Sequence, residues 1–467
     1  MKFNVRIKAS RIIIIKRLTL LFLLSSLYSF QTLAYSLENF FTDDFLNTKI
    51  ILNPNLVPKV SFNQNFELDN FDYIKQDPEN LVDPFFKVPD YLSSSVKFWF
   101  DIYTKYDETT TLVHDKINFD LIYGTISFTE LDYNNVGPIT KANFRQQMER
   151  ERFAEIKLAI THIFDGKPLN SFENKILEKI IQAGIVIPLN KKDKNKLKTN
   201  LLRGLRRQSG LKNQINQGLI YFDQYRNTIQ KYLNIFELPE EILAIAFVES
   251  SFNIKAHSRA GAVGVWQFIK STGHSFLNIS DNYDERKNII LSTLGAFHLL
   301  KQNFRIYESW PLAISAYNSG HKHILKARSL NRKGKFSFQK FLEDYSHADI
   351  MFASKNYFSE VLAMILSLKY RKYFYKSIAN DSYKEFYLYK NLHFSNLQKT
   401  STQLGLDRLR LRSLNPHLPA QSNPPLMVTL TLDQIIDHPE YVLIDDKLVT
   451  KYFPKNFKKI SKVKVAQ

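Results

Sequence analysis

The chain has 467 residues, of which 64 are Lys or Arg and 45 are Asp or Glu, giving a formal net charge of +19 at pH 7. It contains no cysteine, which excludes a disulfide framework, a thiolate metal site and the acylated cysteine of a lipoprotein. The positive charge favours anionic partners, such as nucleic acid or anionic lipid headgroups.

The N-terminus has the three parts of a secretory signal. Basic residues are frequent up to Arg17, an apolar run covers Leu18–Tyr28, and Thr32-Leu33-Ala34 is a small-residue cleavage site. Residues 1–34 are therefore predicted to be a signal peptide, with a permanent membrane anchor as the alternative. An exported protein is expected in the periplasm, where it meets anionic envelope surfaces first, so no nucleic-acid partner is predicted.

Residues 35–140 are predicted to form an irregular region with a small β component. Two runs of alternating β-branched and aromatic residues, Val96–Tyr103 and Ile117–Phe128, flank a polar stretch and predict a hairpin. Trp99 in the first run is expected in the core. Residues 141–232 repeat apolar side chains at steps of three or four, which predicts a helical region throughout.

The apolar segment Ile242–Val248 ends at Glu249. Because it is apolar on nearly all sides, it predicts a helix buried in a core. A carboxyl group next to such low-dielectric material resists ionisation, so the pKa of Glu249 is expected to rise towards neutrality. A solvated Glu at a helix end is the alternative interpretation.

The residues that follow Glu249 suit a sugar ligand. Gly261 and Gly264 allow a tight turn and close approach of the backbone. Trp266-Gln267-Phe268 predicts an aromatic wall with an amide between its rings, which matches the apolar faces and hydroxyl edges of a pyranose. The role of Ser250 is open between capping the helix end and taking part in catalysis.

Three blocks stand in the order typical of one enzyme family. They are Glu249-Ser250, the Ser-x-x-Gly-Ala-x-Gly-x-Trp-Gln-Phe run at 258–268, and Ala316-Tyr317-Asn318-Ser319-Gly320. In these blocks the chain resembles the lytic transglycosylases of bacterial cell walls, a lysozyme-like family that includes soluble lytic transglycosylase and membrane-bound lytic murein transglycosylase D. Tyr357 is a looser match to a family Tyr that closes the cleft near the acid, and its alternative is a core aromatic.

The resemblance implies cleavage of the β-1,4 bond between N-acetylmuramic acid and N-acetylglucosamine in peptidoglycan. Glu249 would protonate the glycosidic oxygen and then take a proton from the C6 hydroxyl, leaving a 1,6-anhydro end without consuming water. Ser258 would orient the N-acetyl group, and Tyr357 would position Glu249. The residues expected to bind substrate are Ser258, Gln267, Tyr317, Asn318 and Tyr357. No cofactor is implied.

Other polar groups of this region are expected to be structural. Asp284-Glu285-Arg286 precedes a predicted helix, where acids favour capping and ion pairing. His321 and His323 have no third residue at ligand spacing, so they are expected at the surface and no metal site is predicted.

The fold class predicted is mainly α, with a lysozyme-like catalytic domain at 233–385 and a helical, partly β N-terminal extension. Residues 386–467 are predicted to form a degenerate LysM-like segment, without an evident opening strand, and a basic tail. The predicted partner is the peptidoglycan glycan strand, and the oligomeric state is left open. A goose-type lysozyme-like hydrolase of peptidoglycan and a non-catalytic peptidoglycan-binding protein are the alternative functions.

Overall fold

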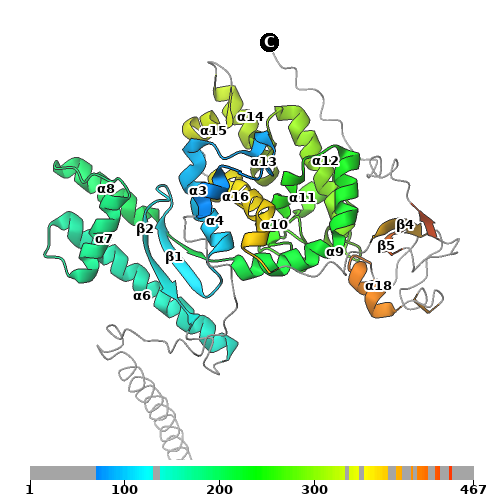
Figure 1. Ribbon diagram of the computed structural model, residues 1–467, viewed down its shortest axis with the longest axis horizontal. Coiled ribbons are helices and arrows are strands. Elements are labelled where there is room, and N and C mark those ends of the chain that lie inside the picture. The colour runs from blue at the N-terminus through cyan, green and yellow to red at the C-terminus, as the bar shows by residue number, and fades with distance from the viewer. Residues whose placement is uncertain are drawn as a thin grey trace, which may run out of the picture. The chain divides into compact units, whose positions relative to one another are not determined.

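The computed structural model describes residues 70–129, 137–331, 336–345, 352–376, 385–391, 401–402, 407–418, 426–431 and 441–443. The predicted signal peptide and the basic tail lie outside these residues. The described part is mainly helical, as predicted (Figure 1).

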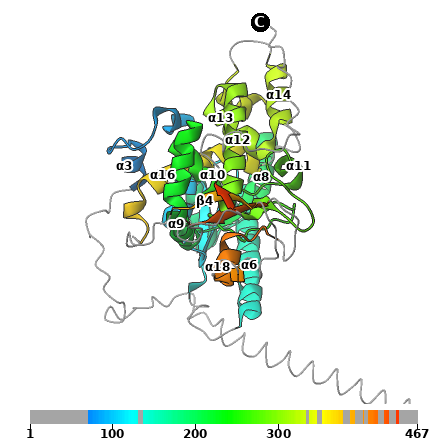
Figure 2. The same ribbon diagram turned by 90° about the vertical axis from the view of Figure 1, so that its right-hand side faces the viewer.

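The larger hydrophobic core is built mainly by a group of packed helices. They are α4 (Ser93–Thr104), α9 (Lys212–Phe236), α10 (Ala244–Ser250), α12 (Ile289–Tyr307), α13 (Trp310–Ser319) and α16 (Phe352–Lys369). Helix α16 packs against α4, α10 and α13, while α12 packs against α9 and α13. Figures 1 and 2 show α10 and α16 side by side within this group of helices.

Helix α4 overturns one sequence prediction. The run Val96–Tyr103 was expected to be a strand and is helical. Its apolar residues fit helical steps at 96, 99, 100 and 103 and alternating steps at 96, 98, 100 and 102, so a short apolar run does not distinguish the two structures. Trp99 is buried in the core, as expected.

Asparagine side chains fix the starts of three helices. The Asn288 side chain accepts a hydrogen bond from the Leu291 N–H at the start of α12. Asn170 and Asn190 cap α7 (Ser171–Gln182) and α8 (Lys191–Gly204) in the same way. Each cap satisfies one of the N–H groups that a helix start leaves without a partner.

A second, smaller core lies between a sheet and three helices. The strands are β1 (Thr110–Asp115), β2 (Ile122–Ser127) and β3 (Leu205–Ser209), in the antiparallel order β2-β1-β3, and the helices are α6 (Pro138–Asp165), α7 and α8. The prediction that 141–232 is helical throughout is therefore wrong at β3, which pairs with β1. Strand pairing with a distant segment overrides local propensity there.

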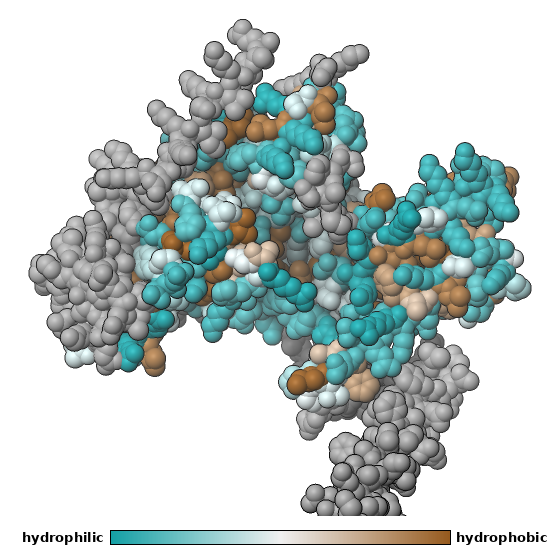
Figure 3. Space-filling view, turned by 180° about the vertical axis from the view of Figure 1, so that it is seen from behind, coloured by the Kyte–Doolittle hydropathy of each residue, from teal (hydrophilic) through white to brown (hydrophobic). Residues whose placement is uncertain are grey.

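The surface of the part formed by strands β1–β3 and helices α6–α8 carries apolar side chains among hydrophilic ones (Figure 3). The most exposed apolar residues in the connection between α7 and α8 are Val186 and Leu189. The lysines of α8 follow directly in the sequence.

The C-terminal segment holds a small antiparallel sheet of order β5-β4-β6. Its elements are β4 (Tyr387–Asn391), α18 (Arg408–Leu414), β5 (Leu426–Leu430) and β6 (Tyr441–Leu443). The first strand, β4, was not predicted from the sequence, and it pairs with both other strands. The LysM-like character of this segment stays a prediction.

Further helical elements lie before, between and after the helices of the larger core. They are α3 (Asn70–Lys75), η1 (Pro84–Phe86), η2 (Asp90–Leu92), η3 (Glu240–Leu243), α11 (Lys270–Gly273), η4 (Glu285–Lys287), α14 (His321–Leu330), α15 (Phe338–Asp344) and η5 (Arg371–Tyr373). Among the described helices, none combines the length and the apolar character needed to cross a bilayer.

Gly218 controls how closely α9 approaches the end of α10. A Cβ atom at this position would lie 2.0 Å from the carbonyl oxygen of Ser251. We expect Gly218→Ala to lower the free energy of unfolding by about 1–3 kcal/mol, because backbone must move to relieve the overlap. Chemical denaturation measures this loss. Gly124→Ala is the control, since its Cβ would meet no atom within 4 Å; equal losses in both variants would contradict the packing argument.

Candidate active site

Glu249 lies in the last turn of α10, at the point where the helix leaves the core. The preceding residues 242–247 are all buried, as the apolar pattern predicted. The helix ends because Ser251 and Phe252 both adopt positive φ angles, of 52° and 56°. Two consecutive residues in this region are costly for non-glycine side chains, and such strain is typical of functional sites. The turn leaves the Glu249 side chain half-buried.

Ser250 joins the end of α10 to the loop that follows. Its Oγ donates to the carbonyl oxygen of Val265 at 2.8 Å and of Ala246 at 3.2 Å, and accepts from the Asn253 N–H. All three contacts are to backbone atoms. Of the two roles left open by the sequence, the structure therefore places Ser250 in backbone capping.

The loop 258–268 is held by Arg286. The guanidinium group donates to the carbonyl oxygens of Gly261 and Phe268, each at 3.0 Å, and pairs with Asp284 at 2.8 Å. Gly264 has a φ of 77°, and a Cβ there would lie 2.1 Å from the carbonyl oxygen of Arg286.

The acids of η4 have the structural role predicted for them: Asp284 caps η4, and Glu285 accepts hydrogen bonds from Asn278 and Tyr283.

The predicted aromatic wall is not present. Trp266 and Phe268 are both buried, and the Trp266 indole N–H donates to Thr293 at 2.9 Å. The prediction was wrong because successive side chains in this turn point to opposite sides. The rings of Trp266 and Phe268 point into the core, and the Gln267 amide between them does not. Gln267 is half-buried, has a φ of 47°, and donates to the carbonyl oxygen of Gly264 at 2.8 Å.

Three other predicted site residues come from two places, the loop and α13. The exposed Ser258 accepts the Ala262 N–H at 3.0 Å and so closes its own loop. Tyr317 of α13 donates to the Trp266 carbonyl oxygen at 2.7 Å, which ties α13 to the loop. Asn318, one residue later, is exposed.

Tyr357 of α16 is brought directly to Glu249. Its hydroxyl donates to Oε1 of Glu249 at 2.5 Å, and its side chain is only 4% exposed. Burial raises the pKa of Glu249 to about 7, while the hydrogen bond from Tyr357 acts in the opposite direction. Burial and the nearby Glu249 charge raise the pKa of Tyr357 well above its ordinary value, so this phenol remains a donor at neutral pH.

A second acid with a raised pKa, on the same helix as Tyr357, was missed in the sequence. Glu360 follows Tyr357 by three residues on α16, which places it on the same helix face. Burial, and after it the negative charge of Glu249, raise the pKa of Glu360 to about 8. The three-residue step from Tyr357 is the signal that could have identified it.

The described residues contain no group of three His, Cys, Asp or Glu side chains that could hold a metal ion. His321 and His323 are bonded to tyrosines: Nδ1 of His321 lies 2.9 Å from the Tyr307 hydroxyl, and Nδ1 of His323 lies 3.2 Å from that of Tyr345. The expectation that both are surface residues is wrong for His323, which is buried because α15 and the residue after it cover it.

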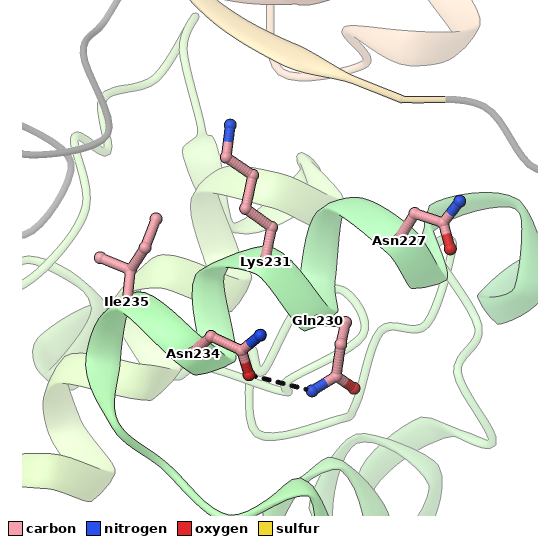
Figure 4. A pocket seen from close by; sticks show the side chains of 5 residues that line it. All are labelled: Asn227, Gln230, Lys231, Asn234 and Ile235. Atoms are coloured by element: carbon pink, nitrogen blue, oxygen red, sulfur yellow. Dashed lines mark hydrogen bonds between the residues drawn. The ribbon is translucent and has the colours of Figure 1, made fainter.

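A shallow groove of about 550 Å³ lies along α9 (Figure 4). Its lining, Asn227, Gln230, Lys231, Asn234 and Ile235, comes from this helix alone. None of these residues contacts Glu249 through a hydrogen bond, so the groove is not part of the site around that carboxyl group.

Comparison with known proteins identifies the class. Residues 227–339 match the family model described as Transglycosylase SLT domain, a stretch that includes Glu249, the loop 258–268 and Tyr317. The chain therefore carries a transglycosylase SLT domain. Tyr357 lies beyond the matched stretch and reaches Glu249 through the packing of α16 on α10.

Two relatives carry the same printed name. They are "Membrane-bound lytic murein transglycosylase D" from Escherichia coli K12 and from Escherichia coli O6:H1, each 28% identical over 184 residues. The match covers 38% of this chain and 39% of each relative. In this stretch the chain is similar to lytic murein transglycosylases, in agreement with the resemblance found in the sequence, and it spans about two fifths of the length of these relatives.

The hydrogen bond from Tyr357 stabilises the ionised form of Glu249. We therefore expect Tyr357→Phe to raise the pKa of Glu249, because the carboxylate loses its donor while burial remains. Titration of the carboxyl carbons by ¹³C NMR, with Glu249→Gln used for assignment, measures the change. Tyr345→Phe is the control, because that hydroxyl contacts His323; an unchanged or lowered Glu249 pKa in Tyr357→Phe would contradict the assigned role of the bond.

Proposed function

We propose that the protein is a peptidoglycan lytic transglycosylase that cleaves the β-1,4 bond between N-acetylmuramic acid and N-acetylglucosamine and forms 1,6-anhydro-N-acetylmuramic acid ends. The observation that carries this proposal is the half-buried Glu249, which lies in the stretch matched by the transglycosylase SLT domain, has a pKa of about 7 and accepts a hydrogen bond from Tyr357 of α16. A carboxyl group with a pKa near the working pH is suited to give up a proton and to take one back.

The reaction uses Glu249 twice. The neutral carboxyl donates its proton to the glycosidic oxygen as the bond from C1 to that oxygen breaks. The resulting carboxylate, with the Tyr357 hydroxyl still bound to Oε1, then accepts the proton of the C6 hydroxyl as O6 bonds to C1. Glu249 ends protonated, no water is consumed, and the muramic acid residue ends as a 1,6-anhydro sugar.

The residues proposed to hold the glycan surround the end of α10. Ser258 orients the N-acetyl group, and Gln267, Tyr317 and Asn318 bind the sugar. Two features support this assignment: Gln267 and Tyr317 are fixed by hydrogen bonds to the same loop, and the Asn318 amide is exposed directly after Tyr317. Fixed polar groups lose little entropy when a ligand binds.

We also propose that the protein works in the cell envelope after export to the periplasm. The basic and apolar composition of residues 1–34 supports this location. The printed names of the two Escherichia coli relatives refer to murein and to a membrane-bound form, and association with anionic envelope surfaces agrees with the net charge of +19.

Glu249→Gln should lower the rate of product release from purified peptidoglycan by about 10²–10⁴-fold, the usual size of a general acid–base contribution. Mass spectrometry of the released muropeptides identifies the reaction, since 1,6-anhydro ends are one water lighter than hydrolysis products. Glu237→Gln, at an exposed residue, serves as the control. Reducing ends from the unchanged protein would identify a lysozyme-type hydrolase, and binding without any product would identify a peptidoglycan-binding protein.

Asn318→Ala tests the sugar contacts separately from the acid. Losing one hydrogen bond to the glycan, worth about 0.5–1.5 kcal/mol, should raise KM by roughly 2–10-fold with a smaller change in kcat. Steady-state kinetics on a soluble glycan fragment measures both constants. Asn227→Ala, at an exposed residue of the α9 groove, should leave them unchanged; an unchanged KM in Asn318→Ala would remove Asn318 from the binding site.

A further inference from the structure

We propose that the α7–α8 tip, residues 183–196, docks on the surface of an anionic phospholipid bilayer. The tip consists of the connection that follows α7 and the first turns of α8. The inference rests on the proposed location in the cell envelope and not on the proposed reaction. It gives the association with anionic envelope surfaces a defined place on the molecule.

Two apolar side chains of the tip point into solvent because their neighbours point into the smaller core. Ile185 and Ile187 pack against that core, whereas Val186 is 85% exposed and Leu189 is fully exposed. A single exposed apolar side chain is common on protein surfaces. Exposed apolar side chains gathered at one turn are typical of sites that contact a protein or a membrane.

Hydrogen bonds at both ends hold the connection in this shape. At the end of α7, the Gly184 N–H donates to the carbonyl oxygen of Ile181 at 2.9 Å, and Gly184 has a φ of 76°. At the start of α8, the Asn190 side chain accepts the Asp193 N–H at 2.8 Å. The apolar side chains are therefore presented before a ligand binds, which reduces the entropy lost on binding.

Lysines follow the apolar pair directly in the sequence. Lys191, Lys192 and Lys196 are exposed on α8, and no ion pair engages any of the three in the part of the chain that the structure describes. The acid of the tip, Asp193, accepts a hydrogen bond from the Asn190 amide at 2.8 Å. Lysines at this position are attracted to anionic headgroups, and their long stems let the ammonium groups stay in water beside an apolar contact.

The combination of features selects a bilayer among the anionic partners of the envelope. Peptidoglycan offers carboxylates to the lysines but has no apolar interior that could receive Val186 and Leu189. A symmetric contact with a second copy would place the same lysines against one another, which is unfavourable. An anionic bilayer supplies negative headgroups at its surface and acyl chains directly below them.

The first test removes the apolar contact. The chain without its predicted signal peptide, residues 35–467, should sediment with vesicles of phosphatidylglycerol and phosphatidylethanolamine but not with vesicles of phosphatidylcholine. Val186→Ser combined with Leu189→Ser should lower the partition coefficient by roughly tenfold or more. Leu158→Ser, at an exposed leucine of α6, is the matched control and should leave the partition coefficient unchanged.

The second test separates the charge of the tip from the charge of the whole chain. Lys192→Gln combined with Lys196→Gln should lower the partition coefficient by roughly 20–30-fold at low salt, and by less as ionic strength rises. Lys167→Gln combined with Lys175→Gln removes the same net charge at exposed lysines outside the tip, and should have a smaller effect. Thermal unfolding verifies that each variant folds.

A fluorescent side chain reports insertion directly. Trp99, Trp266 and Trp310 are all buried, so Leu189→Trp adds an exposed indole at the tip. Its emission should shift to shorter wavelength when anionic vesicles are added, and brominated acyl chains should quench it. An unchanged emission spectrum in the presence of bound vesicles would show that the tip does not enter the bilayer.

Three other outcomes would overturn the proposal. Equal vesicle binding by the unchanged protein and both tip variants would assign the binding to the general positive charge of the chain. Binding to purified peptidoglycan that is lost in the tip variants, without vesicle binding, would assign the tip to the cell-wall polymer. A dimer lost in Val186→Ser combined with Leu189→Ser, again without vesicle binding, would assign the tip to a second copy.

The docking and the reaction fail separately. Vesicle binding is measured without any substrate, so a protein that releases no anhydro products can still confirm or refute the docking surface. Conversely, the tip variants should release anhydro products from soluble glycan fragments at the rate of the unchanged protein, because no proposed catalytic or sugar-binding residue lies in the tip.

Discussion

The hydrogen bond between Tyr357 and Glu249 is the constraint on which the site depends. The two residues lie on α16 and α10 and are 108 positions apart in the chain. Their contact at 2.5 Å therefore requires the core that holds these helices together, in which α16 also packs against α4 and α13. Since α4 ends at residue 104, residues outside the stretch matched by the family model help to support the site.

The loop after α10 is shaped largely by contacts to its own carbonyl groups. Ser250, Arg286 and Tyr317 each donate to a backbone oxygen of the loop. These donors satisfy groups that would otherwise be buried without a partner, which is costly in a low-dielectric interior. The same contacts hold Gln267 in its positive-φ conformation. The loop is thus rigid before any ligand binds, which reduces the entropy lost on binding.

Glu249 and Glu360, the two acids with strongly raised pKa values, lower the stability of the fold at neutral pH. The pKa values of Glu249 and Glu360 are about 7 and 8 in the folded chain, above the ordinary Glu value of about 4.3 that applies when the chain is unfolded. Below that ordinary pKa both acids are protonated in the folded and the unfolded state, so they cost no stability. As pH rises further, the unfolded state ionises first, so stability falls until the folded pKa values have been passed. Retaining such groups is typical of sites where function conflicts with stability.

The sequence by itself predicted the raised pKa of Glu249, the loop that follows it and the similarity to lytic transglycosylases. The apolar run Ile242–Val248 and the glycines at 261 and 264 are local patterns, and local patterns can be read directly from the order of residues. Only the tertiary structure decided which side chains meet Glu249. Tyr357 was a looser match, because helix packing between distant segments selects the face that reaches Glu249. Trp266 was assigned to a sugar-binding wall and lies in the core, and the run Val96–Tyr103 is a helix. In both cases burial against distant residues, which the local pattern does not contain, set the outcome.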